Sequence, residues 1–287
     1  MKTSLDHLPQ AKREQLEQAT KIIVDTVQPE KVILFGSYAR GKWVEDQHME
    51  GHILHEYVSD YDILVVTRRD EERIEHEVQE MVETRCNFYT PVTVIVHSID
   101  YVNARLSEGQ YFFSDIKKEG ILLYDAGNIL LAEQRELNPV ERQKLAQDDF
   151  DTWFSTAQEF LVDTENALQR KSLKNAAFYL HQAAERTYNA AILVFTGYKP
   201  RTHNLGKLIR LCKDFSPELT RIFPNNTKEE THLFNLLKKA YIDARYKKEY
   251  TITEEELNDL VTRIRQLQAI TERICQEKIA SLSNITE

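Results

Sequence analysis

Hydrophobic and polar residues alternate with two different periods along the chain. In residues 9–27, apolar side chains recur every three or four positions, which predicts an amphipathic helix that ends before Pro29. Short apolar runs follow at 32–35, 63–66 and 92–96, each with the length of a buried strand. A helical pattern over 70–85 separates the last two runs. This order of helices and strands predicts a small α/β domain.

Long helical patterns dominate after Asp125, where glycine becomes scarce. Three short segments come before them: 99–106, a helix at 112–119 and an apolar run at 121–124. Residues 135–168 predict a helix with a break near Asn138 and Pro139, and residues 172–195 predict a second helix that ends at Gly197. Further helices are predicted at 204–214, 217–222, 228–246 and 254–280. We therefore expect two domains, residues 1–127 and an all-helical bundle at 128–287.

Composition narrows the classes of function. The 287 residues carry a net charge of −9 with a pI of about 5.6, which makes binding of long nucleic acid unlikely because that mode depends on basic surfaces. Three widely spaced cysteines form no disulfide framework and no zinc motif, which is typical of reduced thiols. No stretch reaches the ~18 apolar residues of a membrane span. We expect a soluble, cytoplasmic protein.

The candidate chemistry lies between the first two apolar runs. Gly36 and Ser37 follow a strand directly, where the backbone can turn and direct N–H groups at an anion, and Arg40 comes one turn later. We expect a helix to begin near Tyr38. Asp60 and Asp62 would project from one face of the next strand. Adjacent carboxylates repel each other unless a cation lies between them, and Mg²⁺ is commonly held by carboxylates together with phosphates.

Each motif alone is common as an ordinary turn or strand end, but their occurrence together favours a functional site. The sequences are GSYARG at 36–41 and SDYD at 59–62. They resemble the signature of the DNA-polymerase-β-like nucleotidyltransferase superfamily, in particular its minimal prokaryotic members. The resemblance implies an α/β (α+β) fold with a small mixed sheet. It also implies that Gly36 and Ser37 bind the phosphates of an NTP, and that Asp60 and Asp62 bind two Mg²⁺ ions.

Two features depart from this family. Residues 42–58 form an insert, for which we expect a hairpin with its tip near Glu50 and Gly51; its histidines, His48, His52 and His55, have weak metal-site spacing. The family also expects a third carboxylate on the following strand, where this chain has Thr93. Three explanations are open: another domain supplies the acid, the alignment is shifted, or the site binds nucleotide without fast catalysis.

The second half carries the segments YLHQAAER at 179–186, GYKPRTHNL at 197–205 and AYIDARY at 240–246. They resemble HEPN domains, helical modules that are often encoded beside, or fused to, minimal nucleotidyltransferases. Many HEPN domains are ribonucleases with a histidine four to six residues after an arginine. No histidine follows Arg245 at that distance, so RNase activity is disfavoured. Arg201, His203 and Arg245, with Lys247 and Lys248, are candidates for binding phosphates instead.

Relatives that modify antibiotics close a helical domain over the catalytic sheet, so we expect that Glu185 or another acid of the bundle could replace the missing carboxylate. The leading hypothesis is Mg²⁺-dependent transfer of an NMP from an NTP to an unidentified acceptor hydroxyl of a small molecule, a protein or an RNA end. The alternatives are a nucleotide-binding regulatory module without turnover and a toxin–antitoxin-like fusion. The resemblance to HEPN domains also implies a homodimer through the long helices.

Overall fold

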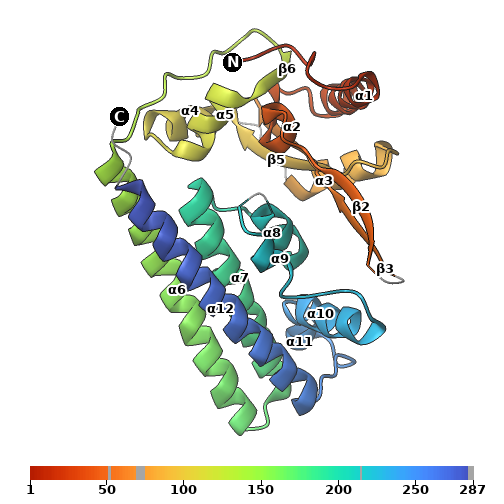
Figure 1. Ribbon diagram of the computed structural model, residues 1–287, viewed down its shortest axis with the longest axis vertical. Helices are drawn as coiled ribbons and strands as arrows, with labels where there is room; N and C mark the ends of the chain where they lie inside the picture. The colour runs from red at the N-terminus through yellow and green to blue at the C-terminus, as the bar shows by residue number, and fades with distance from the viewer. Residues whose placement is uncertain (51–52, 69–74, 214, 284–287) are drawn as a thin grey trace. The chain divides into compact units, whose positions relative to one another are not determined.

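The computed structural model describes residues 1–50, 53–68, 75–213 and 215–283, without the side chains of 45–50, 53–58 and 76. The chain divides into two compact units, Met1–Glu136 and Leu137–Glu287, each of which is described by itself (Figure 1). Among the described residues, no helix is both long enough and apolar enough to cross a membrane.

The first unit combines strands and short helices. Its strands are β1 (Lys31–Phe35), β2 (Glu45–Glu50), β3 (Ile53–Val58), β4 (Tyr61–Thr67), β5 (Val92–Ser98) and β6 (Ile121–Asp125). Its helices are α1 (Gln10–Val27), α2 (Gly36–Arg40), α3 (Glu75–Arg85), α4 (Ile99–Ser107) and α5 (Tyr111–Glu119). The predicted α/β domain with a small mixed sheet is confirmed.

Four strands form the sheet in the order β5-β4-β1-β6. Strand β1 is antiparallel to both of its neighbours, whereas β4 and β5 are parallel. Because side chains alternate along a strand, the sheet has two apolar faces. Val32 and Leu34 contribute to a buried cluster with α1 and α3, while Ile33 points to the opposite face, where α4 and α5 pack. Covering both faces explains why the strands read as continuous apolar runs.

The insert between the two sequence motifs forms a separate two-stranded sheet. Strands β2 and β3 pair antiparallel, and His48 lies opposite His55 in the register. The expected hairpin is therefore confirmed for the backbone. Its tip at residues 51–52 and the imidazoles of His48, His52 and His55 lie outside the described part of the structure.

The second unit is all-helical, as expected. Its helices are α6 (Pro139–Gln169), α7 (Leu173–Thr196), α8 (Leu205–Cys212), α9 (Pro217–Thr220), α10 (Lys228–Ala240), α11 (Asp243–Tyr246) and α12 (Glu254–Leu282). The long helices α6, α7 and α12 pack alongside one another (Figure 1). Helix α7 is central, because it also contacts α8, α10 and α11. Its many alanines allow this close approach from several sides.

Three helices have bounds in the structure that differ from those predicted from the sequence. Helix α6 begins at the suspected break, because Asn138 caps it and Pro139 takes the first helical position. Helix α3 is observed from Glu75, and residues 69–74 lie outside the description. The single helix predicted over 228–246 is wrong: α10 ends at Ala240 and a one-turn helix follows. The backbone departs from ideal helical angles at Ile242, with φ −106° and ψ −54°.

Candidate functional site

Strand register brings the two motifs of the first unit together. Asp62 is the partner of Phe35 in the antiparallel β1–β4 pair and of Thr93 in the parallel β4–β5 pair. These three residues therefore form one row across the sheet, on the face to which the Asp62 side chain points. Gly36 follows Phe35 directly, so the turn after β1 lies beside the carboxylate of Asp62.

Gly36 makes the closest approach between the turn and the acidic pair. Its φ of +73° lies in the region that favours glycine, and a Cβ there would stand 2.2 Å from Oδ2 of Asp62. Any side chain at this position would displace the carboxylate. Helix α2 begins at Gly36, two residues earlier than expected, so the buried Ser37 belongs to its first turn. Backbone N–H groups at such a start are suited to an anion.

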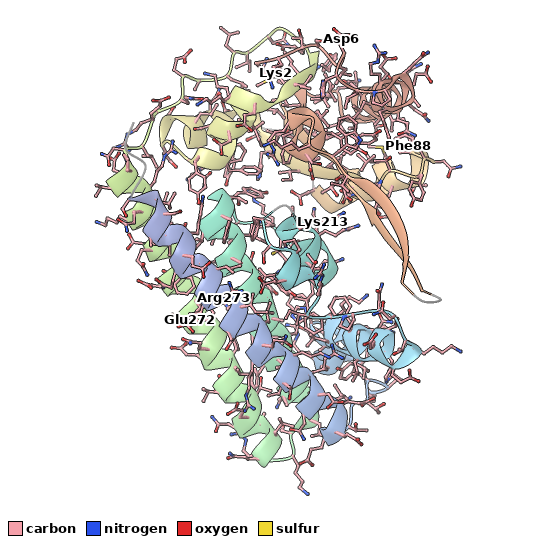
Figure 2. All side chains as sticks on the ribbon, viewed as in Figure 1. Lys2, Asp6, Phe88, Lys213, Glu272 and Arg273 are labelled. Carbon is pink, nitrogen blue, oxygen red and sulfur yellow. The ribbon has the colours of Figure 1, made fainter. Side chains whose placement is uncertain are left out.

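Two tyrosines hold the motifs against each other from within the core. Tyr38 follows Ser37, and Tyr61 stands between the two aspartates with its side chain on the opposite face of the strand. Both are fully buried, and their ring centroids are 4.4 Å apart. The Tyr61 hydroxyl donates a hydrogen bond to Oε1 of Gln15 at 2.7 Å. The ring of Phe88, labelled in Figure 2, lies edge-on to the Tyr61 ring, with the ring centroids 6.2 Å apart.

Further contacts fix Tyr38 itself. Its ring stacks on that of Trp43, with the ring centroids 5.4 Å apart, and its backbone carbonyl oxygen lies 2.8 Å from Nε2 of His7. Sequence reasoning did not single out these aromatic residues. The available signal was an aromatic residue one position after Ser37 and another between the aspartates, where alternation directs a side chain into the core. The packing of Tyr38 and Tyr61 in the core therefore fixes the distance between the Gly36–Ser37 turn and the two aspartates.

Thr93 interacts directly with the acidic pair. Its Oγ1 donates a hydrogen bond to Oδ2 of Asp60 at 3.1 Å, and the residue is only 6% exposed. Asp60 and Asp62 are half-buried. Within the described residues, no group of three or more His, Cys, Asp or Glu side chains is arranged to hold a metal. The two carboxylates suit a cation that takes its other ligands from phosphate and water oxygens.

Arg40 lies at the opposite end of α2 from Gly36. Its guanidinium is half-exposed, with Nη1 4.0 Å from Oε2 of Glu119 on α5. An exposed pair at this distance is weak. Its predicted contact with phosphates stays a prediction.

The second unit contains another cluster of ionisable groups. Nδ1 of His203, in the loop before α8, lies 3.0 Å from both carboxylate oxygens of Glu185 on α7. Glu185 is 7% exposed, and it also accepts a hydrogen bond from Gln182 at 3.3 Å. The predicted role of Glu185 as a replacement for the missing acid stays a prediction. In the structure, the carboxylate is engaged by an imidazole of its own unit.

His181 lies one turn before Glu185 and is fully buried. Burial lowers the pKa of His181 to about 4, and the positive charges of His203 and Arg245 act in the same direction. Its ring lies 5.2 Å from that of Tyr241. His181 is therefore neutral near pH 7, as a packed polar group within the helix contact.

Tyr241 joins the two sides of this cluster. The ring of His203 stacks on it at 4.3 Å, and the guanidinium carbon of Arg245 lies 4.6 Å from its centroid. Nε of Arg245 donates to the Tyr241 carbonyl oxygen at 2.6 Å. The end of α10 at Ala240 places Tyr241 in the turn that meets His203. The helical pattern of the sequence predicted no interruption at this point.

The structure thus brings together Glu185, His203 and Arg245, which are separated by up to 60 positions in sequence. Arg201 is exposed in the same loop as His203, two residues earlier. Lys247 is paired with Asp243 at 2.9 Å. We name the group of Glu185, His203, Tyr241 and Arg245 the imidazole–arginine cluster.

Comparisons with known proteins address the two halves separately. Residues 17–128 match the family model described as polymerase beta, nucleotidyltransferase, and residues 150–274 match the model described as HEPN domain. Among solved structures, the chain is similar to the protein TT1696 from Thermus thermophilus. That similarity has 19% identity, covers 43% of this chain and 96% of the other, and has a TM-score of 0.34. A search of the curated proteins found no match.

The family matches agree with the observed architecture. The first covers the mixed sheet with Gly36, Ser37, Asp60 and Asp62, and the second covers the cluster around α7. The chain is therefore a fusion of a polymerase-β-type nucleotidyltransferase domain, at residues 17–128, with a C-terminal HEPN domain, at residues 150–274.

Proposed function

We propose that the N-terminal domain transfers a nucleoside monophosphate from an NTP to an acceptor hydroxyl. The observation that supports this proposal is the close approach of Gly36 to the carboxylate of Asp62, because a turn suited to an anion then lies beside an acid suited to a cation. Ser37 and the N–H groups of the first turn of α2 bind phosphate oxygens, and Arg40 adds positive charge. Asp60 and Asp62 hold magnesium, which neutralises charge on the phosphates when it is bound.

In this reaction, the acceptor oxygen forms a bond to the α-phosphorus while the bond to the β-phosphate oxygen breaks, and pyrophosphate leaves with the electron pair. The contribution of the protein is mainly positioning and charge stabilisation. The acceptor hydroxyl also needs a base for its proton.

The test is release of pyrophosphate from ATP, CTP, GTP or UTP in the presence of Mg²⁺. We expect release with at least one of them, and the double variant Asp60→Ala plus Asp62→Ala should lower it at least about 100-fold, a typical cost of removing positioned charge from an active site. Asp25→Ala is the matched control, because Asp25 is an exposed aspartate on α1. Equal release by the double variant and the control would contradict the proposal.

A second candidate is a nucleotide-binding regulatory module without turnover. The hydrogen bond from Thr93 to Asp60 favours it, because a neutral hydroxyl occupies the place where the family has a third acid. In that case labelled NTP would bind the wild-type chain, would bind the Asp60/Asp62 double variant at one site fewer, and would be recovered intact from the complex.

We also propose that the imidazole–arginine cluster of the HEPN domain binds a phosphate group. Arg245 is exposed, and its guanidinium lies over the rings of Phe178, Tyr241 and Tyr246. Its Nε also donates a hydrogen bond to the Tyr241 carbonyl oxygen. Because the side chain is already ordered, binding a ligand costs less conformational entropy. The imidazole of His203 is 57% exposed and is oriented by Glu185. These groups together suit an anion that carries a flat ring, such as a nucleotide.

Fluorescent ATP binding measures this second site when the first is disabled by the Asp60/Asp62 double variant. In that background, we expect Arg245→Ala to weaken binding about tenfold, which corresponds to about 1.4 kcal/mol. Arg265→Ala is the control, because Arg265 is an exposed arginine on α12 that pairs with Glu165. The proposal is wrong if Arg245→Ala and Arg265→Ala bind equally well.

A further inference from the structure

The row of residues across the sheet contains a neutral side chain where a two-metal site needs charge. Asp62 has Phe35 as its partner on one side and Thr93 on the other. Thr93 is 6% exposed, and its hydroxyl lies 3.1 Å from Oδ2 of Asp60. The hydroxyl donates to the carboxylate, so the β5 side of Asp60 faces a proton donor and not another acid.

A proton donor and a cation compete for the same carboxylate oxygen. Oδ2 of Asp60 can still accept a ligand through its second lone pair, but the oxygen is partly neutralised by the Thr93 hydroxyl. A pair of divalent ions ~3.5–4 Å apart carries four positive charges and needs bridging carboxylates between them. Asp60 and Asp62 supply two carboxylates and Thr93 supplies none, so one of the three carboxylates that the family resemblance implies for two ions is missing.

Phosphates complete the coordination of one ion without further protein ligands. Mg²⁺ prefers six oxygens and is usually bound by one or two carboxylates plus substrate phosphates and water. The contact between Gly36 and Asp62 places the phosphate-binding turn beside one of the two acids, so a carboxylate and a phosphate can share an ion there. In two-metal transfer, a second ion activates the acceptor hydroxyl. Here that ion would lack a carboxylate ligand on β5, because Thr93 offers only a neutral hydroxyl.

We infer that this site binds one divalent cation with the NTP, in place of the two ions that the family resemblance implies, and that Thr93 sets this number. The inference rests on the proposed binding of a metal–nucleotide complex by Asp60 and Asp62. It predicts tight binding of nucleotide combined with slow transfer. Thr93 thereby acts as a positioning residue for Asp60 and as the residue that limits metal loading.

Counting bound Mn²⁺ tests the inference directly. Every chain, including the one with the wild-type Thr93, carries Arg245→Ala, so that nucleotide at the imidazole–arginine cluster adds no ion to the count. The full chain is titrated with Mn²⁺ in the presence of a non-hydrolysable ATP analogue, and free Mn²⁺ is measured by electron paramagnetic resonance, with the analogue alone subtracted. We expect one bound ion per wild-type chain and two per Thr93→Asp chain, because the new carboxylate lies in register with Asp62. Thr93→Asn, of similar shape but neutral, should bind one ion.

The outcomes separate the inference from the function on which it rests. Two ions per wild-type chain, or one per Thr93→Asp chain that still unfolds cooperatively, would overturn the inference while leaving the proposed function in place. No analogue-dependent Mn²⁺ binding by the wild-type chain would overturn both. If Thr93→Asp does not fold, the number of Mn²⁺ ions bound by the wild-type chain decides alone: the inference requires one ion, and two would overturn it.

Discussion

At the scale of single residues, burial in the folded domain decides the protonation state of His181, whose role the sequence leaves open. An imidazole in an alanine-rich helix can be a ligand or a packed polar group, and its sequence neighbours are the same in both cases. The structure buries it completely on α7, where its ring faces that of Tyr241, and burial lowers its pKa from 6.5 to about 4. The unfolded chain therefore binds a proton at higher pH than the folded chain does.

We expect acid to destabilise the HEPN domain through this residue. As pH falls from 6.5 toward 4, the unfolded state takes up the proton first, and the domain loses roughly 3 kcal/mol of unfolding free energy. Urea unfolding at pH 7, 5.5 and 4.5 measures the loss. His181→Gln should reduce this pH dependence. Identical pH profiles for His181→Gln and wild type would contradict the assignment.

The positions of the candidate nucleotidyltransferase residues were largely predictable from sequence, because local rules set them at strand ends; their roles stay predictions. A glycine–serine turn after one apolar run and two aspartates before another predict two strand ends, and the register confirms that Gly36 lies against Asp62. The contact between Tyr38 and Tyr61 was missed. An aromatic residue in the core looks the same in sequence whichever partner it meets, so only the packed structure identifies this pair.

At the scale of elements, a local capping signal marks the beginning of α6, whereas the end of α10 has no such signal. Asn138 and Pro139 suggested a break in a helix expected from 135, and the structure begins α6 there, with reciprocal capping bonds between Asn138 and Glu141. The break after α10 has no comparable signal, because Tyr241 and Ile242 continue a helical pattern of apolar positions. The stacking of Tyr241 on His203, from a segment almost forty positions earlier, accompanies the break. Tertiary contact outweighs helical propensity there.

At the scale of the whole molecule, each unit has a hydrophobic core of its own. One buried cluster joins the sheet to α1 and α3, and the other joins α6, α7 and α12. Residues 126–138 connect the units and contain no helix or strand before α6. Separate cores joined by an irregular segment are typical of domains that can fold alone.

We therefore predict that the fragments 1–136 and 137–287 fold independently. Each should show the circular dichroism expected of its elements and a cooperative urea transition. A control fragment, 1–110, lacks α5 and β6 and should be unfolded, because β6 is an edge strand paired with β1 and α5 covers one face of the sheet. Failure of 1–136 to fold, while the full chain folds, would contradict the independence of the two cores.

Sequence alone determined the class of each half, the order of most of its elements, and the positions of the glycine–serine turn and the acidic pair at strand ends. These follow from hydrophobic period and from motifs whose residues are close in the chain, so the physical causes are local. Tertiary structure decided which groups meet across long separations: Thr93 with Asp60, Tyr38 with Tyr61, and His203 with Glu185 and Tyr241. Strand register and packing set those contacts, and both depend on the whole core and not on any single segment.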